Sequence, residues 1–160
     1  MKKFELTDEF ITNAFGNKLF RIKAIVDFGT IRAGELGGFV EKEENLSNDD
    51  NAWVSGNARV SDDARISDDA RISGNAQVSG NADYAVVEGF GRYFRATTFF
   101  RCKDKILRVQ CGCFYGDLAE FREIVKKTHG DSKYAKEYLA IADLMELHFS
   151  DDEGRQEAAE

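Results

Sequence analysis

A strict six-residue pattern of apolar and polar positions runs through the centre of the chain. Each unit offers a β-branched residue, a serine, a Gly or Asp, an Asn or Asp, an alanine and a long polar residue, and five units follow one another from Val54 to Asp83. Apolar residues at this period do not stay on one face of a helix, and a long flat strand is excluded because every unit contains its own turn. The pattern therefore predicts a repeat protein of short strands and turns.

The chemistry of each slot predicts where its side chain lies. The β-branched residues are expected to point inward, because their stiff side chains pack well in strands. The alanines suit positions where three faces crowd together, and the Gly/Asp and Asn/Asp pairs tolerate left-handed backbone angles in turns. The inward residues are Val54, Val60, Ile66, Ile72 and Val78, and the alanines are Ala58, Ala64, Ala70, Ala76 and Ala82.

These repeats resemble the left-handed parallel β-helix of the hexapeptide-repeat acyltransferase superfamily. In that superfamily three hexapeptides make one triangular coil, so the resemblance implies that residues 18 apart stack and that the repeats make roughly two coils. The expected stacked pairs are Trp53 with Arg71, Arg59 with Gln77, and Arg65 with Asp83.

The segments on both sides of the repeats are predicted to cover their open ends. Residues 18–40 are rich in strand-forming residues, and residues 93–114 have the pattern of a β-hairpin around Lys103-Asp104-Lys105. A first helix is predicted to begin at the capping box of Asp117 and Glu120 and to stop at Gly130. A second is predicted to begin at Asp131-Ser132.

The predicted fold class is mainly β: a short left-handed parallel β-helix of hexapeptide repeats with a small C-terminal α+β unit, made of a β-hairpin plus two helices. The expected units are a β-rich N-terminal cap over residues 1–45, the β-helix over 46–90, the hairpin and helices over 91–150, and an acidic tail over 151–160. The tail has no apolar periodicity, which is typical of a solvated segment.

A second resemblance covers nearly the whole chain. The stretches Phe20 to Gly29, Ala33 to Glu41, Cys111 to Phe114 and Thr128 to Asp131, taken together with the repeats, resemble uncharacterised hexapeptide-repeat proteins of bacteriophages and prophages, which are often labelled transferases. The resemblance implies a viral origin and a location in the cytoplasm of the host cell. It implies no activity that could be assigned to particular residues.

The composition of the chain limits which classes of partner and which cellular location we expect. The net charge of −7 argues against direct nucleic-acid binding, because the overall field repels phosphates. The apolar runs are too short to span a bilayer, and the start of the chain has no apolar stretch behind Lys2 and Lys3, so we expect neither a membrane span nor a signal peptide. Three cysteines without framework spacing indicate reduced thiols, as in a cytoplasmic protein.

The outward slot of the repeats carries the candidate ligand-binding residues. Arg59, Arg65 and Arg71 hold the same slot in successive units, and an exposed Trp53 beside Arg71 would suit a base or another planar ligand. If subunits meet along these faces, arginines of neighbours converge on an anion. The alternative is that the arginines pair with aspartates of the repeats on a solvated surface. Those aspartates are Asp62, Asp63, Asp68 and Asp69.

The sequence contains no strong pattern for a metal site or for a catalytic site. Cys102, Cys111, Cys113 and His129 could form a Cys3His zinc site, but their spacing matches no strong zinc signature and core thiols are favoured. We therefore predict no metal and no other cofactor. Enzymes of the superfamily use a histidine as general base, whereas this chain has no histidine before His129, so no catalytic residue is assigned.

The predicted function is that of a non-enzymatic, self-associating binding protein of phage or prophage origin, with a homotrimer favoured. Its partner is a host protein or a small phosphorylated, nucleotide-like ligand, which fits a role in counter-defence against host immunity. The alternative is a small hexapeptide-repeat acyltransferase that uses acyl-CoA.

Overall fold

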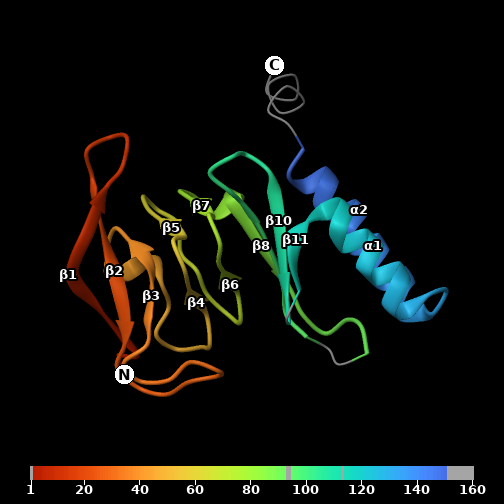
Figure 1. Cartoon of the computed structure of the whole chain (residues 1–160), viewed down its shortest axis with the longest axis horizontal. Coiled ribbons are helices and arrows are strands. Elements are labelled where there is room, and N and C mark those ends of the chain that lie inside the picture. Colours follow the sequence, from red (N-terminus) through yellow and green to blue (C-terminus); the bar gives the residue numbers. More distant parts are fainter. Residues whose placement is uncertain (1, 93–94, 113, 151–160) are drawn as a thin grey trace.

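The computed structural model describes residues 2–92, 95–112 and 114–150. Figure 1 shows the elements following one another along the longest axis, from β1 at one end, through the repeats, to a second sheet and two helices at the other end. The order of these layers in space is therefore their order in the sequence, and each layer packs against the one before it.

The first three strands of the chain belong to a mixed five-stranded sheet. Its order is β1-β2-β3-β5-β7. The first three strands are β1 (Phe4–Thr12), β2 (Lys18–Ala24) and β3 (Leu36–Val40), and they pair antiparallel. The other two come from the repeats, β5 (Arg59–Val60) and β7 (Gln77–Val78), and they pair parallel to β3 and to each other.

The repeats contribute only two-residue strands. Besides β5 and β7, β4 (Trp53–Val54) and β6 (Arg71–Ile72) form a two-stranded parallel sheet. The predicted pairs Trp53 with Arg71 and Arg59 with Gln77 are partners in these ladders, each 18 residues apart. A short helical turn precedes the repeats at Glu43–Asn45, and another forms the end of the last unit at Asn81–Asp83.

The predicted roles of the repeat slots are confirmed at most positions. All five β-branched residues from Val54 to Val78 are fully buried, and so are the alanines from Ala58 to Ala76. Ala82, at the end of the last unit, is exposed. The third slot adopts left-handed backbone angles in the first four units, with φ of 62° at Gly56, 55° at Asp62, 60° at Asp68 and 62° at Gly74.

The prediction of a mainly β fold built on a left-handed parallel β-helix is wrong. One sheet is mixed and one is antiparallel, and each parallel ladder joins only two pairs of residues. The physical reason lies in the lengths of the strands. A unit with its own turn leaves two residues for a strand, whereas the flanking segments supply longer strands that pair antiparallel and take β5 and β7 into their sheet.

A buried lysine ties the first sheet to the repeats. The Lys3 side chain is almost fully buried, and its Nζ donates to the carbonyl oxygens of Asp50 (2.8 Å) and Ala52 (2.6 Å). The ammonium group also lies 4.6 Å from the centre of the Phe28 ring. Burial lowers the pKa of Lys3, and the nearby Asp50 carboxylate opposes this shift.

A four-stranded antiparallel sheet follows the repeats, in the order β11-β10-β9-β8. Its strands are β8 (Tyr84–Val87), β9 (Thr97–Arg101), β10 (Leu107–Cys111) and β11 (Phe114–Asp117). Strands β9 and β10 form the predicted hairpin, with Phe99 opposite Val109.

Two helices close the described part of the chain, α1 (Leu118–His129) and α2 (Lys133–His148). The predicted capping box is confirmed, because the Asp117 carboxylate accepts from the Glu120 N–H and the Glu120 carboxylate accepts from the Asp117 N–H. Gly130 caps α1 and Ser132 caps α2, at the predicted boundaries. Neither helix is long and apolar enough to cross a membrane.

The buried side chains form two clusters that meet at β9. The first cluster contains the inward residues of the repeats, and Phe100 of β9 belongs to it. The second fills the space between the antiparallel sheet and the helices, and the neighbouring Phe99 belongs to it. Because successive side chains of a strand point to opposite faces, β9 connects the two clusters.

Candidate functional site

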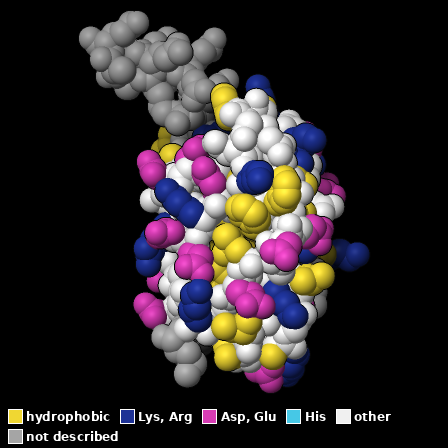
Figure 2. Space-filling model, turned by 90° about the vertical axis from the view of Figure 1, so that its left-hand side faces the viewer, with side chains coloured by type: hydrophobic (Ala, Val, Ile, Leu, Met, Phe, Trp, Pro, Cys, Tyr) yellow, Lys and Arg dark blue, Asp and Glu magenta, His cyan; other side chains and the backbone are white. Residues whose placement is uncertain are grey.

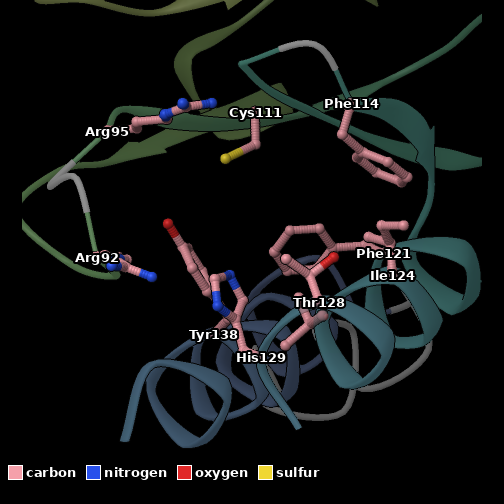
Figure 3. A pocket seen from close by; sticks show the side chains of 10 residues that line it. Arg92, Arg95, Cys111, Phe114, Phe121, Ile124, Thr128, His129 and Tyr138 are labelled. Atoms are coloured by element: carbon pink, nitrogen blue, oxygen red, sulfur yellow. The ribbon is translucent and has the colours of Figure 1, made fainter. Parts of the chain in front are cut away.

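A cavity of about 270 Å³ lies between the antiparallel sheet and the helices. Figure 3 shows the sheet on one side of it and α1 and α2 on the other. The sheet and its β8–β9 loop supply Arg92, Arg95, Cys111 and Phe114, and the helices supply Phe121, Ile124, Val125, Thr128, His129 and Tyr138. The lining is mostly apolar and aromatic, with a few polar groups, which is typical of a small-molecule site.

Aromatic rings form the inner wall of this cavity, which we call the aromatic cavity. Phe121 packs edge-on against Tyr138, with ring centres 5.8 Å apart, and His129 stacks on Tyr138, also at 5.8 Å. Burial raises the pKa of the Tyr138 hydroxyl, and the neighbouring Cys111 adds to the shift. Tyr138 therefore stays protonated at neutral pH, and its hydroxyl donates to the Phe90 carbonyl oxygen at 3.5 Å.

Two arginines stand on one side of the aromatic cavity. Figure 3 shows Arg92 and Arg95 on the side toward which the Tyr138 hydroxyl points. Gly91, with φ of 78°, allows this arrangement, because a side chain there would collide with the Tyr138 ring. Its N–H donates to the Glu137 carboxylate at 2.9 Å, which anchors the loop that precedes Arg92 to α2.

A second hollow adjoins the aromatic cavity through Arg95. It encloses about 480 Å³, and we call it the arginine hollow. Gly112 leaves room for the Arg95 guanidinium, since any side chain there would collide with it. The lining residues are Gly29, Thr30, Asn51, Asp69, Arg71, Arg95, Ala96, Gln110 and Gly112.

The Arg71 side chain is held in place within the arginine hollow. Its Nη2 donates to Thr30 Oγ1 at 2.8 Å, and its backbone N–H donates to Thr98 Oγ1 at 3.0 Å. Gln110 also joins the hairpin to the repeats, because its Oε1 accepts from Ser73 Oγ at 2.8 Å. Guanidinium and amide groups from the repeats and from the hairpin thus meet at one place.

The structure does not bring the four predicted ligand-binding residues together. Arg71 lines the arginine hollow, Arg59 lines a separate cavity and Arg65 is exposed. The expectation that Trp53 is exposed is wrong: the ring is 1% exposed and packs edge-on against Phe28. Its side chain points into the repeat core, so a planar ligand cannot reach it.

As the alternative to anion binding, we predicted that the repeat arginines form ion pairs with repeat aspartates. Within the ranges that the structure describes, none of Arg59, Arg65 and Arg71 forms an ion pair. The acidic groups near the arginine hollow contact each other instead. Burial and a hydrogen bond with Asp69 raise the pKa of Glu88.

The cysteines considered for zinc lie in different surroundings. Cys102 is buried in the repeat cluster, whereas Cys111 and His129 line the aromatic cavity. Cys113 falls outside the described residues. No group of three or more metal-ligating side chains occurs in the described part of the chain. Thr97 Oγ1 donates to Cys111 Sγ at 3.2 Å, a contact between neighbouring strands.

The aromatic cavity was missed at the sequence level. Phe121 and Tyr138 have the spacing of apolar helix faces, which indicates core packing and carries no sign of a cavity beside them. The only local signal was the pair of glycines at 89 and 91 just before Arg92, which is typical of a loop that approaches another element closely.

A comparison with protein families gives one match. Residues 64–80 match the model described as YdcK Beta solenoid repeat, so this segment is similar to a β-solenoid repeat. The match includes Arg71 of the arginine hollow and no residue of the aromatic cavity. No curated protein matches the chain.

Proposed function

We propose that the protein binds a small ligand that joins a planar ring to an anionic group, of the kind found in nucleotides. The observation that carries the proposal is that Arg95 lines both the aromatic cavity and the arginine hollow. A ligand that spans both would place its ring among aromatic side chains and its anionic group among guanidinium groups.

The chemistry of the lining supports this class of ligand. Planar rings stack on, or pack edge-on against, aromatic side chains, and Phe121, His129 and Tyr138 present such rings. Guanidinium groups bind phosphate through two parallel hydrogen bonds, and Arg71 and Arg95 converge on one hollow. The Tyr138 hydroxyl lies on the side of Arg92 and Arg95, and because it already donates to the Phe90 carbonyl oxygen at 3.5 Å, it can accept a hydrogen bond from the ligand.

The biological role we propose is sequestration of such a ligand without chemical change. In a protein of phage or prophage origin, acting in the cytoplasm of the host cell, removal of a phosphorylated signalling molecule would counter host defence. The proposal rests on the resemblance described above for its biological setting and on the two adjoining cavities for its chemistry.

Calorimetric titration with adenosine monophosphate and with a cyclic dinucleotide tests the proposal. We expect wild-type protein to bind at least one of them and Arg95→Gln to weaken that binding at least about tenfold, since a hydrogen bond to a charged group contributes about 1.5–3 kcal/mol. Arg71→Ala should weaken binding in the same direction, because Arg71 lines the same hollow.

The matched control is Arg65→Gln, which removes an exposed arginine from the same repeat slot. It should leave the affinity unchanged. Equal losses in Arg65→Gln and Arg95→Gln would indicate a general charge effect and would count against the proposed site. Failure of the wild-type protein to bind either ligand would leave a host protein as the partner.

We also propose that the protein self-associates. Strand β1 lies at the edge of the mixed sheet, where unpaired backbone groups can pair with a second copy. Figure 2 shows apolar side chains gathered across the face at this end of the molecule, among charged groups of both signs. Phe10 of β1 is 45% exposed, and Phe15 in the turn after it is 87% exposed.

Light scattering at micromolar concentration measures the subunit number. Pairing of β1 strands would give a two-fold dimer, whereas contact between repeat faces would give the homotrimer that the sequence analysis favours. Phe10→Lys should dissociate a dimer formed through β1, and Ile106→Lys, which replaces an exposed apolar residue of the β9–β10 turn, should not. A wild-type mass equal to one chain of 18.0 kDa would contradict self-association.

A further inference from the structure

A separate cavity of about 350 Å³ lies over the mixed sheet, beside the repeats. The residues that matter for its chemistry are Phe39 of β3, Arg59 of β5, Lys103 of the β9–β10 turn and two asparagines of the repeat turns, Asn57 and Asn75. It shares no lining residue with the aromatic cavity or the arginine hollow.

A row of paired residues across the sheet positions Arg59. Arg21 of β2 is opposite Phe39, Phe39 is opposite Arg59, and Arg59 is opposite Gln77. The Arg21 guanidinium stacks 4.3 Å from the centre of the Phe39 ring and donates to the Glu9 carboxylate at 2.9 Å. Arg21 is therefore neutralised, and Phe39 separates it from Arg59.

In the described ranges, Arg59 and Lys103, unlike Arg21, are not paired with a carboxylate. Among the residues that the structure describes, neither Arg59 nor Lys103 forms an ion pair or donates a side-chain hydrogen bond. No residue that lines the cavity is acidic. Arg59 is half-buried and Lys103 is exposed. Two like charges that line one cavity repel each other, and an anion between them offsets this repulsion.

The backbone around the two cations is fixed. The N–H of Lys103 donates to the Asn75 carbonyl oxygen at 2.9 Å, and Ala76 forms an antiparallel bridge with Cys102. The β9–β10 turn is thus tied to the repeats beside the cavity that Lys103 and Arg59 line. Asn57 and Asn75, 18 residues apart, hold the same slot in their units and offer amide donors from successive layers.

We propose that this cavity is a second anion site, which binds a phosphate group through Arg59 and Lys103 with the help of Asn57 and Asn75. Two cations match the two negative charges that a phosphate carries near neutral pH. A guanidinium supplies a fork of donors and an ammonium a compact charge, which together suit a tetrahedral oxyanion. The ligand is either free phosphate or the phosphate monoester of a small molecule, and it is independent of the ligand proposed for the aromatic cavity.

The test is a titration of the full chain with inorganic phosphate, followed by the backbone amide signals in NMR spectra. It is done in an Arg95→Gln background, so that binding in the arginine hollow does not contribute. We expect shifts centred on Asn57, Asn75 and Lys103 and a dissociation constant on the order of 1 mM at low salt. Arg59→Gln and Lys103→Gln should each weaken this binding at least about tenfold.

Arg65→Gln and Lys105→Gln are the matched controls, because they remove an arginine of the same repeat slot and a lysine of the same turn. They should leave the shifts unchanged, and an equal loss in the controls would overturn the proposal, as would the absence of shifts in the parent protein. Tighter binding of glycerol phosphate than of inorganic phosphate would identify a monoester as the ligand, whereas equal binding would identify the free ion; both outcomes support the site. Unchanged amide dispersion in Arg59→Gln verifies that the variant is folded.

Discussion

Replacing Ile72 with Asp is expected to unfold the protein. Ile72 lies in β6, is fully buried and faces the cluster formed by the inward residues of the repeats. A carboxylate at this position would lose its hydration and gain no partner, which costs several kcal/mol. Because small domains are stable by only about 5–15 kcal/mol, we expect Ile72→Asp to show no cooperative thermal transition by circular dichroism.

Ile106→Asp provides the control for this experiment. It introduces the same charge at an isoleucine that is 44% exposed, so its effect should stay within about 0.5–1 kcal/mol. A folded Ile72→Asp protein that melts cooperatively near the wild-type temperature would show that the β-branched slot does not form the core of the repeats. Equal destabilisation of the two variants would point to charge in general as the cause.

Replacing Phe121 with Ala is expected to destabilise the protein by about 3–5 kcal/mol, the usual cost of truncating a buried aromatic residue. Phe121 is 2% exposed and makes ring contacts with Phe99, Phe114 and Tyr138. Because Phe121 lines the aromatic cavity, its truncation enlarges that cavity and removes the ring contacts. Urea denaturation measures the loss as a lower midpoint with an unchanged slope.

Ile124→Ala is the matched variant, since Ile124 lines the same cavity but is exposed. It should cost no more than about 1 kcal/mol. We also expect one transition in the Phe121→Ala protein, because Phe99 and Phe100 of β9 join the helical cluster to the repeat cluster. Two separate transitions would contradict that coupling, and a loss below about 1 kcal/mol would contradict the central place of Phe121 in its cluster.

The local structure of the repeats could be predicted because each slot fixes one property. β-Branched side chains without polar atoms have to be buried, and Gly or Asp at the third slot allows a positive φ, as seen at Asp62 and Asp68. Helix caps have equally local causes, which is why Asp117 and Ser132 were found at their helix starts.

The fold class could not be predicted in the same way, because strand pairing depends on partners far apart in the chain. The repeat pattern contains no information on which flanking strand joins β5, and the pairing of Phe39 with Arg59 places the repeats in a mixed sheet. Hexapeptide periodicity describes turns and burial well, but the sheet to which each two-residue strand belongs is decided by the longer strands beside it.

The sequence selected the outward slot of the repeats for ligand binding, and the structure places Arg59 and Arg71 of this slot in two different cavities. Ligand binding by these residues stays a prediction. Trp53 was wrongly included, because its place before the first β-branched residue did not reveal that the ring fills the space between the repeats and Phe28. Arg92 and Arg95 reach the site through the loop between β8 and β9, for which the sequence offers only the glycines at 89 and 91 as a signal.

The central claim is that a planar, anionic ligand lies in the aromatic cavity with its charged group beside Arg95. Its most direct test is an NMR titration of the wild-type protein with the nucleotide that calorimetry shows to bind. The account predicts that the largest shifts occur at Thr128, His129 and Gly112, which line the aromatic cavity and the adjoining hollow. Shifts confined to the β1 edge or to the repeat faces, with these three amides unmoved, would contradict it.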